Sequence, residues 1–345
     1  MPTYTHGGDI WAFGSPVLDF SANLHPLGMP REVAAAAREA VAEAIHYPDP
    51  FCRRLRAAIS SLLDVPAEQV ICGGGAADLI GRLCLALRPR RAVVTAPTFS
   101  EYEQFLRLAG CRVERYGLRG EEQFDLTEPF LDAVEDGVDM VFLCTPNNPT
   151  GRLVPPALLE RIAARCRERG ALLVVDECFI TLTDGPSILP LLDRYPNLFL
   201  LRAFTKSYAM PGLRLGYGLC ADEALLDRLY AAGQPWGVST VAQAAGEAAC
   251  AVPDWPERGR VLLRAERPRL TAALRDLGLT VWEGEANYLL FRAPGDQGLK
   301  ERLAERGILI RSCANYPGLA GDYYRTAVRT REDNETLIRN LKEVL

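Results

Sequence analysis

Four side chains of different chemistry stand at or just beyond the ends of apolar runs in the chain. The runs cover Arg91–Ala96, Met140–Cys144, Leu172–Asp176 and Leu198–Ala203, and the side chains are those of Phe99, Asn148, Asp176 and Lys206. In open sheets built from such runs, ligands bind at the carboxyl ends of the strands. An aromatic ring, an amide, a carboxylate and an amine are therefore expected to meet at one sheet edge.

These four groups match the needs of a pyridinium ring that carries an aldehyde. The amine of Lys206 can bond to the aldehyde as a Schiff base, and Asp176 can keep the ring nitrogen protonated so that the ring accepts electrons. Phe99 can stack on a ring face, and Asn148 can donate to a phenolic oxygen. The residues predict an enzyme that uses pyridoxal 5'-phosphate to act on an amino acid.

Each residue taken alone has a simpler explanation. The chain holds only three lysines, and Lys300 and Lys342 lie in polar helical stretches, where lysines are ordinarily solvated. Lys206 differs because it follows an apolar strand and precedes Ser-Tyr-Ala-Met-Pro-Gly. Asp176 alone could cap a helix. Only the joint position of the four residues favours the cofactor.

A glycine run offers a place for the phosphate of that cofactor. Gly73–Ala77 lies between the short apolar run Val70–Cys72 and a helix expected to begin near Asp78. Glycine permits close backbone approach, a helix N-terminus favours an anion, and Arg214 can add a fork of donors. A tight turn explains the glycines equally well. A G-x-G-x-x-G nicotinamide motif fails, because Asp78 occupies the third glycine position.

The order of elements predicts an α/β fold in two parts. Continuous apolar runs separated by helical patterns are typical of a mostly parallel sheet with helices on both faces. Beyond about residue 240, a helical stretch interrupted near Pro253 and Pro256 leads to a smaller α+β unit. The expected divisions are an arm over 1–25 that contributes to the substrate site, a large cofactor domain over 26–240, and a small domain over 241–345. Helices are expected over 30–45, 101–109, 156–169, 187–194, 298–306 and 332–345, and further strands over Leu215–Cys220, Leu279–Trp282, Tyr288–Arg292, Ile308–Arg311 and Tyr324–Arg329.

Composition limits the partners. The formal net charge of the 345 residues is −5, without a basic stripe, which argues against nucleic acid and against an anionic membrane. The ten cysteines form no C-x-x-C pair and several lie in apolar runs, as in reduced buried thiols. The start of the chain has no signal-peptide pattern, and no apolar stretch could span a bilayer. We expect a cytoplasmic protein without a metal.

Three motifs are similar to those of the fold type I pyridoxal phosphate enzymes of the aspartate aminotransferase superfamily: Thr145–Gly151, Val175–Glu177 and Thr205–Gly216. The resemblance covers essentially the whole chain. It implies that the mostly parallel sheet of the large domain is of the seven-stranded type, with helices on both faces. It implies Asp176 at the pyridine nitrogen, Asn148 at the phenolic oxygen and Phe99 on the ring. It places Gly75, Ala76, Thr205 and Arg214 at the phosphate. It also implies a homodimer in which Tyr47 reaches the phosphate of the neighbouring subunit.

Within this superfamily the chain resembles two families, the threonine-phosphate decarboxylases and the histidinol-phosphate aminotransferases. The stretches similar to the decarboxylases are His6–Gly8, Asp19–Asn23, Pro26–Gly28, Lys206–Gly212, Ile310–Cys313 and Tyr323–Thr330. By this resemblance Arg325 would hold a substrate carboxylate, and His6, Asn23 and Arg311 a substrate phosphate. Phe179 stands where many aminotransferases carry a tyrosine, whereas Gly74, Gly237 and Thr240 depart from the decarboxylase pattern.

The resemblance implies decarboxylation of L-threonine O-3-phosphate to (R)-1-aminopropan-2-yl phosphate, a step of cobalamin biosynthesis, with phosphoserine as a variant substrate. The alternative is an aminotransferase of the histidinol-phosphate type. A cofactor-fold module without catalytic activity, as in some transcription regulators, is a third hypothesis. It usually carries an added DNA-binding domain, for which there is no room before Asp19.

Overall fold

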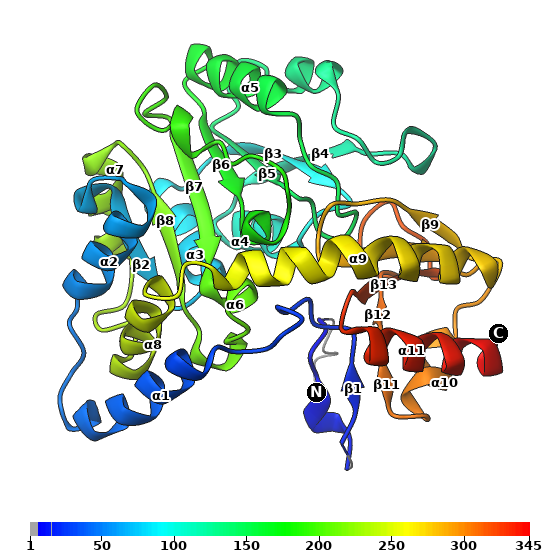
Figure 1. The fold of residues 1–345 in the computed structure, drawn as a ribbon. Helices are drawn as coiled ribbons and strands as arrows, with labels where there is room; N and C mark the ends of the chain where they lie inside the picture. Colours follow the sequence, from blue (N-terminus) through cyan, green and yellow to red (C-terminus); the bar gives the residue numbers. More distant parts are fainter. Residues whose placement is uncertain (1–5, 15) are drawn as a thin grey trace.

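The computed structural model describes residues 6–14 and 16–345. Its centre is a seven-stranded sheet with the order β2-β8-β7-β6-β5-β3-β4 (Figure 1). All neighbouring strands run parallel except at β8, which is antiparallel to both β2 and β7. The strands are β2 (Val70–Gly73), β3 (Arg91–Ala96), β4 (Arg112–Gly117), β5 (Met140–Cys144), β6 (Leu172–Asp176), β7 (Leu198–Ala203) and β8 (Gly216–Leu219). This confirms the predicted fold class.

Both faces of the sheet are buried, which explains why its central strands are apolar without alternation. In β5, Met140 and Phe142 belong to one core cluster, and Val141 and Leu143 belong to the other. The first cluster is completed by α3 (Ala76–Leu87), α4 (Ser100–Leu108) and α7 (Glu223–Ala232). The second is completed by α2 (Arg53–Leu63), α5 (Pro156–Glu168) and α8 (Thr240–Cys250).

A four-stranded antiparallel sheet with the order β12-β13-β10-β9 forms the C-terminal part and has its own apolar core. The long helix α9 (Trp255–Asp276) runs from the large sheet toward it (Figure 1). The other elements there are β9 (Thr280–Trp282), β10 (Tyr288–Arg292), α10 (Leu299–Ala304), β11 (Ile308–Leu309), β12 (Arg311–Ser312), β13 (Tyr323–Ala327) and α11 (Arg331–Val344). Helix α8 packs with the large sheet, although the predicted boundary at 240 assigns it to the small domain. This boundary remains a prediction.

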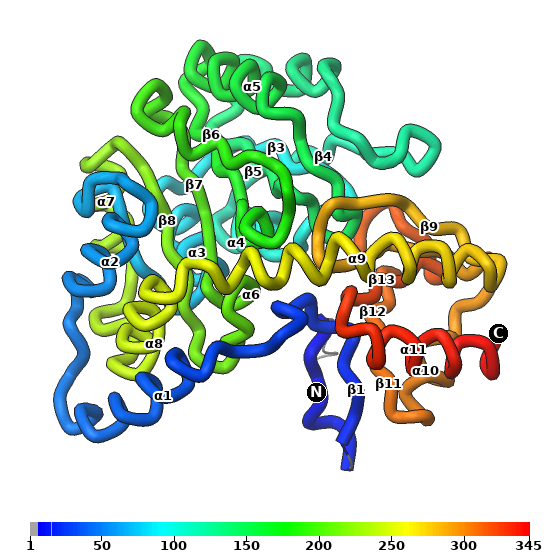
Figure 2. Tube along the Cα trace, viewed as in Figure 1, coloured from blue at the N-terminus to red at the C-terminus, as the bar shows by residue number. Residues whose placement is uncertain are grey.

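The N-terminal segment joins the C-terminal part. β1 (Leu18–Asp19) pairs in parallel with β11, and Figure 2 shows this blue segment beside the orange and red end of the chain. Its continuation reaches the large sheet, because His25 N donates to Lys206 O at 3.0 Å. The remaining elements are α1 (Arg31–Glu39), α6 (Phe204–Ser207) and the short 3-10 helices η1 (Ile10–Ala12), η2 (Ala40–Ile45), η3 (Ala67–Gln69), η4 (Gly120–Glu122), η5 (Glu128–Ala133), η6 (Ile180–Leu182), η7 (Leu189–Leu191) and η8 (Pro211–Leu213).

Three sequence expectations need correction. The helix expected over 187–194 is only the 3-10 turn η7, because Pro190 lacks the N–H that a continuing helix would use. The helix expected over 30–45 ends at Glu39 and continues as 3-10 helix. Strand β4 was not expected, because this edge strand is largely polar and partly exposed. Within the described residues, no helix has the length and apolar character required to cross a bilayer.

Candidate active site

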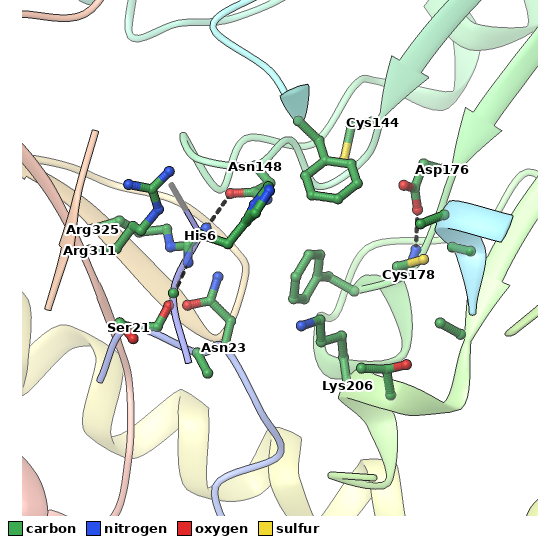
Figure 3. Close-up of a pocket in the computed structure, with 18 of the residues that line it drawn as sticks. His6, Ser21, Asn23, Cys144, Asn148, Asp176, Cys178, Lys206, Arg311 and Arg325 are labelled. Carbon is green, nitrogen blue, oxygen red and sulfur yellow. Dashed lines mark hydrogen bonds between the residues drawn. The ribbon is translucent and has the colours of Figure 1, made fainter. Parts of the chain in front are cut away.

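One pocket gathers residues from the large sheet, the N-terminal segment and the C-terminal part. Of the thirteen predicted site residues, Gly75 borders the pocket and Tyr47 lies elsewhere. The other eleven line it: His6, Asn23, Ala76, Phe99, Asn148, Asp176, Thr205, Lys206, Arg214, Arg311 and Arg325. In Figure 3, Asp176 lies at one end of the pocket, Arg311 and Arg325 lie at the other, and Lys206 lies between them. The strand ends bring these groups together, since Asp176 is paired with Cys144 of β5 and Leu201 of β7.

Lys206 stands in the short helix α6, directly after β7, and its side chain is partly buried. Burial, and then the positive charge of Arg325, lower the pKa of the Lys206 amine to about 8. The Nζ atom lies 5.8 Å from the centroid of the Phe179 ring. An amine with this pKa has a substantial neutral fraction near neutral pH, as attack on an aldehyde requires.

Asp176 is a buried carboxylate held by two donors. Tyr102 Oη donates to its Oδ2 at 2.6 Å, and Cys178 N donates to its Oδ1 at 2.9 Å. Burial raises the pKa of Asp176, because the charged form loses solvation. A protonated ring nitrogen would supply the positive charge that favours the carboxylate form. The position therefore fits a pyridinium ring.

The glycine loop and α3 form a concave cradle. Gly75 caps α3 with a φ of +96°, and a Cβ atom there would come within 2.6 Å of Arg214 Nη2. A Cβ atom on Gly216 would come within 2.6 Å of Ala76 N. Thr205 is buried beside this loop, whereas Arg214 is exposed at its edge. Backbone N–H groups at a helix start together with a guanidinium suit a phosphate.

Asn148 has its side-chain oxygen occupied. Its Oδ1 accepts from Arg325 Nη1 at 2.5 Å and from Tyr316 Oη at 3.3 Å. These two donors orient the amide and leave its NH₂ group to serve as a donor, which is the role predicted for it. Phe99 lines the pocket with its ring packed edge-on against Tyr102 at a centroid distance of 5.5 Å.

The other end of the pocket carries positive charge. Arg325 Nη2 donates to Ser21 O at 2.7 Å, and Arg311 Nη2 donates to Asn315 Oδ1 at 2.7 Å. Burial lowers the pKa of Arg311, with the nearby Arg325 charge adding to this effect. Arg325 Nε and Asn23 Oδ1 are buried atoms without a hydrogen-bond partner in the described part of the chain. Such a site favours an anionic ligand that can use the unpaired donor.

A sequence model of the family "Aminotransferase class I and II" matches residues 15–341. The chain belongs to this family. It is 41% identical to a threonine-phosphate decarboxylase of Salmonella typhimurium, over 99% of this chain and 96% of the relative. It is 36% identical to a histidinol-phosphate aminotransferase of Symbiobacterium thermophilum, over 95% and 91% of the two chains. The solved histidinol-phosphate aminotransferase of Clostridium acetobutylicum has a TM-score of 0.88, 29% identity, and coverage of 95% of this chain and 99% of its own.

Membership of this aminotransferase family makes the protein a pyridoxal phosphate-dependent enzyme, which confirms the predicted cofactor. The residues of the pocket fit the group: an amine, a buried carboxylate and a phosphate cradle lie in one cavity. No group of three or more His, Cys, Asp or Glu suited to a metal is present among residues 6–14 and 16–345.

Tyr47 lies apart from this pocket on the surface of the aminotransferase-family chain. Its side chain is 79% exposed and stacks on Trp236 at a centroid distance of 4.4 Å. The chain therefore does not bring Tyr47 to its own cofactor cradle.

Several pocket residues were missed by the sequence reasoning. The sequence analysis assigned no role to four residues that line the pocket: Tyr102, Tyr316, Ser21 and Cys178. Tyr102 has the helical spacing of a core residue, four positions before buried Leu106, so nothing in the pattern distinguishes its hydroxyl. Cys178 follows Asp176 by two residues, and this proximity was the one available signal.

Proposed function

We propose that this enzyme decarboxylates L-threonine O-3-phosphate to (R)-1-aminopropan-2-yl phosphate. The observation that carries the proposal is the pair of buried arginines, Arg311 and Arg325, at the end of the pocket away from Asp176. Two fixed guanidinium groups suit a substrate with two anionic groups, a carboxylate and a phosphate. The 41% identity to a threonine-phosphate decarboxylase supports the same substrate.

The chain's own residues would hold the substrate by its two ends. Arg325 binds the carboxylate, and Arg311 binds the phosphate together with Asn23 and His6. A buried polar atom without a partner costs about 1–3 kcal/mol. Part of that cost at Arg325 Nε is recovered when an anionic group accepts from it, which favours binding of the charged substrate.

The contacts with both ends of the substrate determine which reaction takes place. When bound, pyridoxal phosphate would supply an electron sink for the bond that breaks at Cα. The two arginine contacts fix the rotation about Cα, so they select this bond. If they select the bond to the carboxylate, carbon dioxide would leave and Lys206 Nζ would deliver a proton to Cα. If they select Cα–H, Lys206 would remove that proton, as transamination requires.

A second candidate is an aminotransferase of the histidinol-phosphate type. The TM-score of 0.88 to such an enzyme and the 36% identity to another favour it. Phe179 weighs against it, because this position lacks the hydroxyl that many aminotransferases place there. Phosphoserine could also serve as a substrate of the decarboxylase, since one methyl group is worth only about 1–3 kcal/mol in a pocket.

We also propose a homodimer in which Tyr47 reaches the cofactor phosphate of the neighbouring subunit. The exposed Tyr47–Trp236 stack supports this, because large exposed aromatic groups mark interaction surfaces. We expect the enzyme to act in the cytoplasm and its product to enter cobalamin biosynthesis. Sedimentation of the holoenzyme tests the dimer, and Tyr47→Ala should weaken cofactor binding while the dimer persists.

The decisive experiment measures two products from one incubation. The holoenzyme is given L-threonine O-3-phosphate, with and without 2-oxoglutarate, and both carbon dioxide and glutamate are quantified. We expect carbon dioxide without a requirement for the keto acid, and none from Lys206→Ala. Glutamate formation that requires 2-oxoglutarate, without gas release, would replace the decarboxylase with the aminotransferase.

A further inference from the structure

Residues 6–14 of the N-terminal arm are attached to the pocket at two points. His6 Nε2 lies 2.9 Å from Glu101 Oε1, and Gly8 N donates to Ser21 Oγ at 2.8 Å. Between these two contacts, Gly7 lies so close to the backbone of Ser21 that a Cβ atom at Gly7 would be 2.2 Å from Ser21 O. The same Ser21 oxygen accepts from Arg325, so the arm borders the substrate-binding end of the pocket.

Glu101 is an unexpected residue beside an anion site. It lies in the first turn of α4, its side chain is 12% exposed, and it also accepts a hydrogen bond from the neighbouring Ser100 Oγ at 3.2 Å. A poorly solvated carboxylate is costly unless a cation or strong donors pair with it. The imidazole of His6 fills this need, so Glu101 favours the docked position of the arm.

We propose that Glu101 is a positioning residue that holds His6 and the N-terminal arm against the substrate pocket, where His6 meets the distal anionic group of the substrate. The role of His6 toward a phosphate rests on the proposed function. The attachment of the arm by Glu101 does not. If Glu101 acted only through its negative charge near Arg311, it would oppose binding of an anionic substrate, and removal of that charge would lower the KM. The role in holding His6 predicts the opposite, a higher KM.

The kinetic test uses Glu101→Gln, with Glu103→Gln as the matched control. Glu103 lies on the same helix but pairs with Arg107 and Arg115 away from the arm. For the holoenzyme we expect Glu101→Gln to raise the KM for L-threonine O-3-phosphate about tenfold or more, with kcat within about twofold. His6→Asn should do the same, and the double variant should be no worse than either single variant. An unchanged or lower KM in Glu101→Gln overturns the proposal.

A second measurement is independent of the reaction. Trp11 is 88% exposed within the arm, and chymotrypsin can cleave there when the arm leaves the pocket. Without substrate, the holoenzyme of Glu101→Gln and of His6→Asn should be cut at Trp11 several-fold faster than wild type or Glu103→Gln. Equal cleavage rates would contradict the attachment whatever the substrate is. Faster cleavage with no turnover of phosphothreonine would instead refute the proposed function alone.

Discussion

Removal of a single hydroxyl, in Tyr102→Phe, should weaken cofactor binding through Asp176. The two side chains are buried and share a hydrogen bond of 2.6 Å. Hydrogen bonds to charged groups contribute about 1.5–3 kcal/mol, which corresponds to about 10- to 100-fold in an equilibrium constant. Because this bond favours the ionised carboxylate, its loss raises the pKa of Asp176 further above its ordinary value. Less of the carboxylate is then charged to pair with a ring nitrogen.

The assay is a cofactor titration of the apoenzyme, followed by the visible absorbance of the bound group, at several pH values. Tyr102→Phe should raise the Kd by about 10- to 100-fold, and the deficit should grow as the pH falls, since a raised pKa loses the charge sooner on acidification. The ring stack on Phe142, at 5.0 Å, is retained by phenylalanine. Tyr116→Phe is the control, because its ring packs on Phe130 away from Asp176. Equal affinity of Tyr102→Phe and wild type at neutral and acidic pH would refute the reasoning.

Three further predictions concern the rest of the pocket. Gly75→Ala and Gly137→Ala both force a positive φ on alanine, so each should lower the free energy of unfolding by about 1–3 kcal/mol. Only Gly75→Ala should also weaken cofactor binding, because only its Cβ atom meets the guanidinium of Arg214 at the phosphate cradle. Arg311→Gln should raise the KM for phosphothreonine by about 30-fold or more while turnover of free threonine stays as low as in wild type; an equal loss on both would contradict a phosphate contact. The rate at which the apoenzyme attaches the cofactor should rise with pH through about 8, the pKa of Lys206, and Arg325→Gln should move this rise to higher pH because a neighbouring positive charge is lost.

The fold was largely predictable because its central strands satisfy a strong constraint. Strands β5, β6 and β7 are buried on both faces, so nearly every residue in them is apolar and the runs are visible in the sequence. Strand β4 was missed because it has only β3 as a neighbour and carries residues such as Arg112, Glu114 and Arg115. An edge strand of this kind depends on its partner for its conformation rather than on its own composition.

The site was predictable where position along the chain encoded it. Asp176 ends a strand, Asn148 and Lys206 follow strands, and strand ends meet in space whatever the intervening sequence. The contact between His6 and Glu101 joins residues far apart in the chain, and neither residue type is unusual at its position. Such contacts depend on how the arm folds back over α4, which no local pattern specifies.

Arg325 couples parts of the molecule that the sequence presents as separate. It stands on β13 of the C-terminal part, donates to Asn148 of the large sheet, and donates to Ser21 of the N-terminal segment. Its charge also lowers the pKa of Lys206. A substrate carboxylate that binds Arg325 therefore competes with Asn148 Oδ1 for the N–H groups of Arg325. It also partly neutralises the charge that depresses the lysine pKa. Substrate binding should in this way raise the proton affinity of Lys206, and an amine that holds a proton is the one able to deliver it to Cα.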